Sequence, residues 1–166
     1  MPLIEALLPE FDREMGLTRR ALERVPDGKF DWKPHPTSVT LGRLAEHLTE
    51  MPLWATTTLT QSHLEATTQR PADYTPPTTR AEVVALFDGC LKTARASLVN
   101  KTDGELAAPW TLKNGGKEIF TMPKSTVMRN FVLNHMIHHR AQLTVYFRML
   151  GVPVPSIYGP SGDESV

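Results

Sequence analysis

The sequence of 166 residues has one cysteine, Cys90, and no excess of charge of either sign. A single cysteine excludes an intramolecular disulfide and a cysteine-rich zinc site, and it is typical of a protein in a reducing compartment. Lys and Arg together number 18, as do Asp and Glu, so the sequence predicts no basic surface of the kind that binds nucleic acid. We therefore expect neither a disulfide-stabilised domain nor a nucleic-acid-binding protein.

Long hydrophobic runs are also missing from the chain. None approaches the roughly 18 apolar residues that a membrane-spanning helix needs. The N-terminal segment reaches the acidic Glu10 and Asp12 without the basic start and apolar core of a signal peptide. We expect a cytoplasmic protein without membrane contact, folded as a single domain over residues 1–166 and long enough to bury a hydrophobic core.

The first half of the chain contains two segments whose apolar residues recur every three or four positions, as in amphipathic helices. The first is expected over residues 3–25, where Thr18 interrupts the apolar stripe. The second begins near residues 38–40 and includes Pro52, which should kink or split the helix. A polar, proline-rich linker over residues 69–77 follows it.

The second half of the chain predicts two more helices with a hairpin between them. Thr79 and Glu82 have the spacing of a capping box at the start of the third helix. Asn-Gly-Gly between alternating flanks, within residues 110–120, predicts a small β-hairpin. The last helix is expected from Ser125, a candidate N-cap, to Gly151.

Four long amphipathic helices bury their apolar stripes most simply as a four-helix bundle. We therefore predict an all-α fold, a four-helix bundle with long connections and a small β-hairpin before the last helix. The tail from Val152 onward is rich in Pro, Gly and Ser and is expected to be extended. Its Tyr158 either folds over the mouth of the bundle or lies in solvent.

Three histidines lie on the apolar stripes of two predicted helices. His135 and His139 are four residues apart and so share one face of the last helix, and His47 lies on the stripe of the second helix. Facing helices of a bundle commonly build metal sites, and three neutral imidazoles suit zinc or nickel while leaving a position open for water or substrate. The alternative is that each is a hydrogen-bonded residue of the core, which is the commoner role of a histidine on such a stripe.

The remaining candidates have simpler interpretations. His138 lies about a quarter-turn away from His139 and is expected to face a neighbour or solvent. His35, between prolines, and His63, near the far end of the second helix, are expected at the surface. Cys90 is expected to be a buried, inert thiol rather than a nucleophile.

Four stretches of the sequence resemble a known family. Asn134-His135 and the run from His138 to Gln142 match an HHRGQ-like motif, with Ala141 at the usual glycine, and residues 150–159 match a closing segment. Residues 30–34 and 44–48 resemble the region of the first metal ligand. On these motifs the chain resembles the DinB-like (damage-inducible) superfamily of four-helix bundles, which includes mycothiol-dependent isomerases and bacillithiol transferases.

The resemblance implies that His47, His135 and His139 are the metal ligands, in a bundle with non-sequential helix packing that is often a homodimer. It assigns no role to Arg140 or Gln142. The characterised relatives use a low-molecular-weight thiol whose sulfur the metal activates. By analogy we expect a small-molecule substrate, with such a thiol as the candidate partner, and no nucleic-acid or membrane partner.

Three functional hypotheses follow. The first is a metal-dependent enzyme, a transferase or hydrolase, in which a divalent zinc or nickel ion activates a thiol or water. The second is a stress-related metal-binding protein without turnover, in which the ion is structural or stabilises a dimer. The third is a small-molecule-binding bundle without metal. No catalytic base is assigned, because Glu46 and Glu50, which flank His47, are each expected to be solvated.

Overall fold

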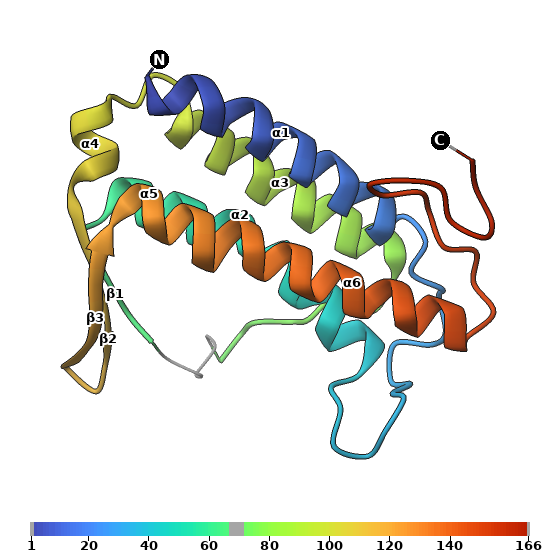
Figure 1. Ribbon diagram of the computed structural model, residues 1–166. Helices are drawn as coiled ribbons and strands as arrows, with labels where there is room; N and C mark the ends of the chain where they lie inside the picture. Colours follow the sequence, from blue (N-terminus) through green and yellow to red (C-terminus); the bar gives the residue numbers. More distant parts are fainter. Residues whose placement is uncertain (1, 67–71, 166) are drawn as a thin grey trace.

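The computed structural model describes residues 2–66 and 72–165 and is mostly helical, with one small sheet. Helices α2 and α3 pack side by side, and α1 and α6 each lie along this pair (Figure 1). The prediction of a mostly helical fold is therefore confirmed. In chain order the elements are α1 (Leu3–Leu22), α2 (Leu41–Thr60), β1 (His63–Glu65), α3 (Arg80–Leu98), α4 (Asp103–Ala107), β2 (Pro109–Asn114), β3 (Lys117–Pro123), α5 (Lys124–Val127), the π-helical segment η1 (Met128–Leu133) and α6 (Asn134–Met149).

Helix α1 ends three residues before the predicted Val25, which lies in a turn after the helix. Thr18, the polar interruption of its stripe, is fully buried and not displaced toward solvent. Its hydroxyl accepts a hydrogen bond from Arg140 Nη1 at 3.1 Å. The interruption is therefore a contact between α1 and α6, since a buried hydroxyl needs such a partner.

Helix α2 carries the first histidine of the candidate site. Thr40 is its N-cap, within the predicted start at residues 38–40, and the Thr40 side chain accepts a hydrogen bond from the backbone of Arg43. Pro52 does not split the helix, which continues to Thr60. Of the two predicted effects of Pro52, a kink or a split, the split does not occur, because the buried apolar face extends beyond Pro52 to Leu59 and holds both parts against the core.

The capping box that was predicted for α3 is present, with reciprocal hydrogen bonds between Thr79 and Glu82. Helix α4 was not predicted, although Thr102 and Glu105 form a second capping box at its start. Of the predicted linker, residues 69–71 lie outside the described residues, and residues 72–77 contain neither helix nor strand.

The predicted hairpin is confirmed as the antiparallel pair β2–β3. Gly115 and Gly116 at its tip have φ of 58° and 75°, values that glycine adopts without steric cost and that suit a tight hairpin turn. Strand β1 was not predicted. It adds to β2 in parallel, so the sheet order is β1-β2-β3, and it places His63 in a strand directly after α2.

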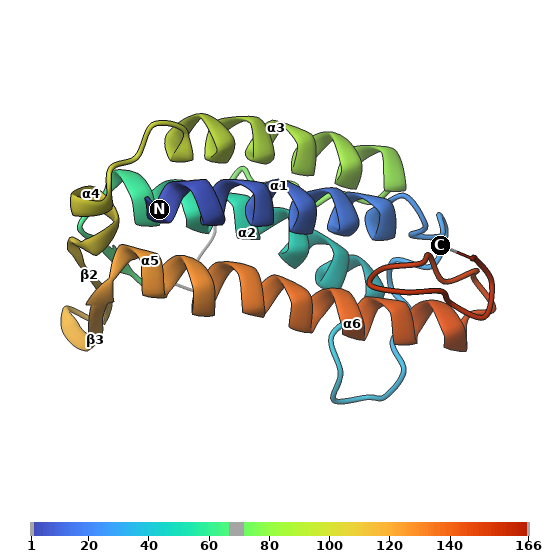
Figure 2. The ribbon, with the colours of Figure 1, turned by 45° about the horizontal axis from the view of Figure 1, so that its top comes forward.

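The last predicted helix is one rod in space but three segments by hydrogen bonding, α5, η1 and α6 (Figure 2). It begins at Lys124 after Pro123, and no side chain caps it, so the prediction of Ser125 as N-cap is wrong. The π-helical turns precede the histidines, which both lie in regular α6. Their four-residue spacing therefore keeps them on one face.

A single cluster of buried side chains joins the helices. It contains residues from α1, α2, α3, α4, η1 and α6, and each fully buried large apolar side chain stabilises the fold by about 1.5–3 kcal/mol. Its largest members are Phe11, Phe87, Phe147, Met15, Leu22, Leu41, Leu44, Leu48, Met51, Leu98 and Leu106.

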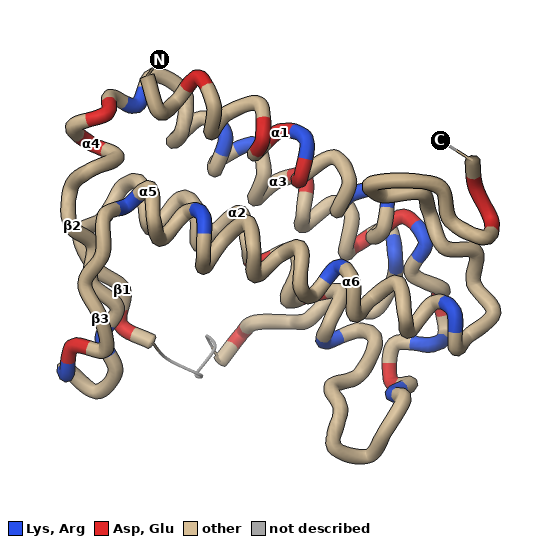
Figure 3. Tube along the Cα trace, in the orientation of Figure 1, with Lys and Arg blue, Asp and Glu red and all other residues tan. Residues whose placement is uncertain are grey.

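The tail after α6 is not a free extension. It folds back toward the end of α1, and its acidic residues lie near basic positions of α1 and α6 (Figures 1 and 3). Glu164 pairs with Arg20 and Arg24, and Asp163 pairs with Arg148. Among the described residues, none of the helices is both long and apolar enough to cross a membrane.

Candidate metal centre

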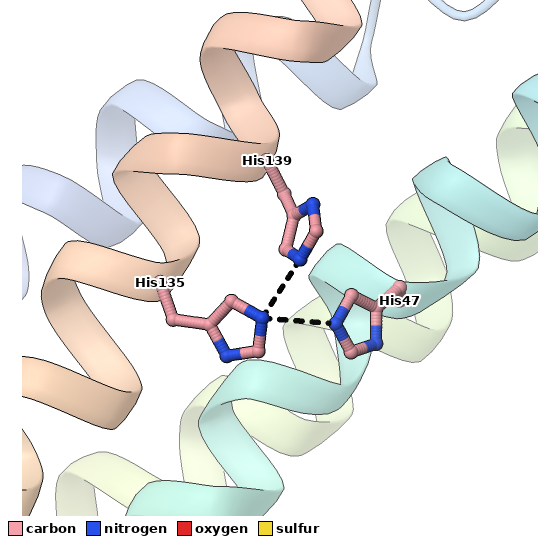
Figure 4. Close-up of side chains that lie close together, drawn as sticks. All are labelled: His47, His135 and His139. Atoms are coloured by element: carbon pink, nitrogen blue, oxygen red, sulfur yellow. Dashed lines mark hydrogen bonds between the residues drawn. The ribbon is translucent and has the colours of Figure 1, made fainter. Parts of the chain in front are cut away.

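Helices α2 and α6 bring three imidazole rings together (Figure 4). His47 projects from α2, and His135 and His139 project from successive turns of α6. The Nε2 atom of His135 lies 2.7 Å from Nε2 of His139 and 3.4 Å from Nε2 of His47. The three rings are half-buried, and each offers a ligand atom within 4.8 Å of the other two. The sequence-based expectation that these side chains converge is met.

Trp54, which follows His47 by two turns of α2, packs against two of the three rings. The Trp54 ring lies edge-on to His135, with centroids 5.6 Å apart, and to His47, with centroids 6.4 Å apart. The sequence placed Trp54 on the apolar stripe but did not reveal that it covers the histidines. The i, i+7 spacing of His47 and Trp54 places both on one face of α2, and it could have predicted this contact.

The surroundings of the rings favour their neutral form. The pKa of His135 is lowered from 6.5 to about 4, mainly because burial disfavours the charged ring and also because His139 and His47 lie beside it. Burial likewise lowers the pKa of His139, and the hydrogen bond with Gln142 opposes that shift. Neutral imidazole is the form that ligates a metal.

The donor set fits a divalent ion by its chemistry and spacing. Two imidazole nitrogens that bind one ion tetrahedrally at about 2.0–2.1 Å lie about 3.3–3.4 Å apart. The distance between Nε2 of His47 and Nε2 of His135 is 3.4 Å, whereas His139 would move back from its 2.7 Å contact with His135. The cluster could therefore hold a metal ion after a small rotation of one side chain.

The Nδ1 atoms of two of these rings point away from the cluster toward polar partners. His47 Nδ1 lies 2.8 Å from Glu50 Oε2, and His139 Nδ1 lies 2.7 Å from Gln142 Oε1. Gln142 is one of the two motif residues to which the resemblance assigned no role. Each partner follows its histidine by three residues, a spacing that places both side chains on the same face of the helix.

The prediction that Glu46 and Glu50 are solvated is wrong. Glu46 is 3% exposed and accepts hydrogen bonds from Tyr74 at 2.6 Å and from Arg43 at 3.3 Å. Glu50 is half-buried beside His47, with Arg43 also within 3.4 Å. Helical periodicity alone did not reveal these partners, because Tyr74 comes from the segment after β1.

Arg140, the other motif residue without an assigned role, does not face the histidines. It is 2% exposed and points toward α1, where it binds Glu14. The Tyr158 hydroxyl also contacts both residues at 2.7 Å, so this part of the tail packs on the helices although Tyr158 as a whole is 57% exposed. The tail around Tyr158 therefore does not simply lie in solvent, because it is hydrogen-bonded to α1 and α6.

The remaining histidines lie outside the cluster, as predicted. His35 is exposed in the segment before α2, and His63 is exposed in β1. His138 is exposed on α6, with its ring edge-on to His139 at 4.9 Å. Cys90 is 8% exposed, and burial raises the pKa of its thiol, which agrees with the inert role expected for it.

An open groove adjoins the cluster on the solvent side of α6 and η1. His135 and His138 line it together with Phe131 and the amides of Asn130 and Asn134. These side chains offer hydrogen-bond donors and acceptors, and none of the five carries a permanent charge.

Comparison with known proteins places this geometry in a family. The sequence model of the DinB family matches residues 3–165. An uncharacterised protein, YrdA of Bacillus subtilis (strain 168), is 28% identical over 165 residues, which cover 97% of this chain and 91% of YrdA.

Two crystal structures are similar to this fold. The structure of a DinB-like protein from Bacillus cereus ATCC 10987 is 25% identical with a TM-score of 0.72, and the match covers 95% of this chain and 98% of that one. The DinB-like protein YjoA from Bacillus subtilis is 19% identical with a TM-score of 0.68, covering 90% of this chain and 96% of that one. By the match over nearly its whole length, the chain belongs to the DinB family.

Proposed function

We propose that His47, His135 and His139 bind a divalent metal ion, zinc or nickel, through their Nε2 atoms. The observation that carries the proposal is the convergence of three Nε2 atoms from two helices. Lowered pKa values keep His135 and His139 neutral at physiological pH, so a proton does not compete strongly for these positions. An ion would replace the close contacts between the Nε2 atoms of these half-buried rings as the partner of their lone pairs.

We propose further that the site is catalytic and acts on a small molecule. Three protein ligands leave a coordination position open, as catalytic sites do. When bound, the ion would lower the pKa of a thiol or water and so supply a nucleophile near neutral pH for transfer or hydrolysis. Around it, Trp54 packs edge-on against His135, and Asn130 and Asn134 would offer hydrogen bonds to a substrate in the adjoining groove.

The main alternative is an ion that stabilises the fold or a dimer without turnover. The buried cluster of apolar side chains argues against it, because that cluster joins all the long helices without using the histidines. We expect the chain to stay folded without metal. A large loss of helical signal on chelation would instead favour the structural role.

We also propose a four-helix bundle, a thiol co-substrate and a homodimer. The arrangement of α1, α2, α3 and the α5–η1–α6 rod supports a four-helix bundle with non-sequential neighbours. A low-molecular-weight thiol is the proposed co-substrate, and a homodimer is the proposed assembly. Light scattering of the metal-loaded and metal-free protein tests the assembly.

Metal binding is tested first by elemental analysis. The purified protein should contain about one divalent ion per chain, and His135→Ala or His139→Ala should abolish binding. His63→Ala is the matched control, because His63 lies exposed in β1 outside the cluster. Equal losses in all three variants, or no ion in the wild type under loading conditions, would contradict the ligand set.

Activity is tested with the cobalt-substituted protein. A thiol that binds the ion should produce a charge-transfer band in the near ultraviolet, and the same thiol should react with a small electrophile only when the ion is present. Metal binding without any thiol effect or metal-dependent hydrolysis would favour the non-catalytic alternative.

A further inference from the structure

Two of the three histidines share one arrangement on different helices. Glu50 follows His47 by three residues on α2, and Gln142 follows His139 by three residues on α6. In each pair an oxygen lies within 2.8 Å of Nδ1, and in each ring Nε2 faces the cluster (Figure 4). The same geometry thus occurs twice around one centre.

The partners determine which nitrogen carries the proton. An ionised carboxylate accepts hydrogen bonds and cannot donate them, so a hydrogen bond between Glu50 and His47 requires the hydrogen on Nδ1. Gln142 presents its carbonyl oxygen to His139, and that oxygen is also only an acceptor. A neutral imidazole carries one ring hydrogen, so in both rings Nε2 is left with a lone pair, which points toward Nε2 of His135.

Glu50 is itself held in place. Both terminal nitrogens of Arg43 lie 3.4 Å from Glu50 Oε2, and Arg43 also contacts the buried Glu46. The Gln142 side chain is exposed and is held in place less firmly than that of Glu50. The α2 ligand therefore has a charged and anchored partner, whereas the α6 ligand has a neutral one.

We propose that Glu50 and Gln142 are positioning residues of the metal centre, which fix His47 and His139 in the Nδ1–H tautomer and aim both Nε2 lone pairs at the ion. This inference rests on the proposed metal binding. Outer partners of this kind orient the ring and raise its basicity, and losing one typically weakens metal binding by about 10- to 100-fold.

Metal affinity gives the first test. We expect Glu50→Ala and Gln142→Ala to raise the dissociation constant for zinc by about 10- to 100-fold in competition with a chromophoric chelator. Glu50→Gln should bind more tightly than Glu50→Ala, because it keeps an acceptor. Gln61→Ala and Glu23→Ala are matched controls from exposed positions outside the cluster and should bind zinc as the wild type does.

A variant that gains affinity for zinc distinguishes a positioning role of these residues from a general role in the stability of the fold. Gln142→Glu places a carboxylate at His139 Nδ1, as Glu50 does at His47, and should lower the dissociation constant for zinc. Because Gln142 is exposed, this variant is expected to fold even if Glu50→Ala does not. Weaker binding by Gln142→Glu, or unchanged binding by both alanine variants, would overturn the proposal.

Nitrogen-15 NMR of the metal-free protein gives a readout that does not depend on metal. At a pH where the rings are neutral, His47 and His139 should show the Nδ1–H tautomer, and each alanine variant should show a mixture at its own ring. The Nε2–H tautomer in both rings of the wild type would overturn the inference whether or not metal binds. Expected tautomers together with no zinc binding would refute the proposed function but not the positioning of the rings.

Discussion

Arg140 and Glu14 form a buried ion pair between two helices, although they lie 126 residues apart in the chain. Arg140 Nη2 donates to Glu14 Oε2 at 2.7 Å, and Arg140 Nη1 donates to the Glu14 carbonyl at 3.0 Å. Arg140 directly follows His139, and consecutive helical side chains point about 100° apart. By directing Arg140 toward α1, the pair fixes the rotation of α6 that directs His139 toward α2.

Removing one partner of this pair should be strongly destabilising. Arg140→Ala leaves Glu14 buried with an uncompensated charge, which typically costs about 3–5 kcal/mol of unfolding free energy. Urea unfolding monitored by circular dichroism measures the loss. Arg95→Ala is the control, because its pair with Asp12 is exposed and should contribute about 0–1 kcal/mol. Similar losses of unfolding free energy in the two variants would show that the buried Arg140–Glu14 pair contributes no more to stability than an exposed pair.

Gly42 and Gly89 should respond to alanine with opposite signs. The start of α2 lies under Phe30, whose carbonyl accepts a hydrogen bond from the Gly42 backbone at 2.9 Å. A Cβ at Gly42 would lie 2.7 Å from Phe30 Cδ1 and 3.1 Å from Phe30 O, so Gly42→Ala should cost about 1–3 kcal/mol of stability.

Gly89 provides the comparison within α3. A Cβ there meets no atom within 4 Å, so Gly89→Ala should stabilise the protein by about 0.5–1 kcal/mol, as expected for alanine in an exposed helix interior. Urea midpoints of both variants check the prediction. A stable Gly42→Ala protein would mean that the Phe30 loop moves away at little cost.

The features predicted from sequence are those with local causes. The capping box at Thr79 and the glycines of the hairpin depend on neighbours a few residues away, and both were predicted correctly. Strand β1 was missed because its three residues pair with β2, nearly fifty positions later, and no local pattern specifies that partner. The π-helical turns of η1 were missed because the apolar spacing resembles that of an α-helix.

The features of the candidate site also divide into those that the sequence could predict and those that depend on distant contacts. The convergence of His47, His135 and His139 could be expected, because apolar stripes turn inward and carry the histidines with them. The contacts of Glu50 with His47 and of Gln142 with His139 could have been predicted from their i, i+3 spacing. The charge of Glu50 had instead suggested that this side chain is solvated. The buried environment of Glu46 could not be predicted, since it depends on tertiary contacts that include Tyr74.

Cys90 should react slowly with thiol reagents. Burial and the negative charge of Glu50 raise the pKa of its thiol, so the reactive thiolate is scarce at neutral pH. Labelling by iodoacetamide, followed by mass spectrometry, should be much slower in the folded protein than in urea and should accelerate as the pH rises toward the raised pKa of the thiol. Because Cys90 is the only cysteine of the chain, the signal has one source. Complete labelling of the folded protein within minutes at neutral pH would contradict the buried environment.

The stability of the metal-free protein should depend on pH through His135. Its pKa is lowered from 6.5 to about 4 in the folded state, so between these values the unfolded chain binds a proton that the folded chain does not. Unfolding free energy therefore falls as the pH is lowered from about 6.5 to about 4, and this contribution does not change further below that range. The lowered pKa of His139 acts in the same direction.

Urea midpoints at about pH 7 and about pH 5, with chelator present, measure this dependence. His135→Phe removes the titrating ring while keeping an aromatic side chain, so the difference between the two midpoints should shrink. His63→Phe is the control and should keep the wild-type difference, because His63 lies exposed in β1. An undiminished difference in His135→Phe would mean that other groups govern the pH dependence, and the environment inferred for the His135 ring would then be wrong.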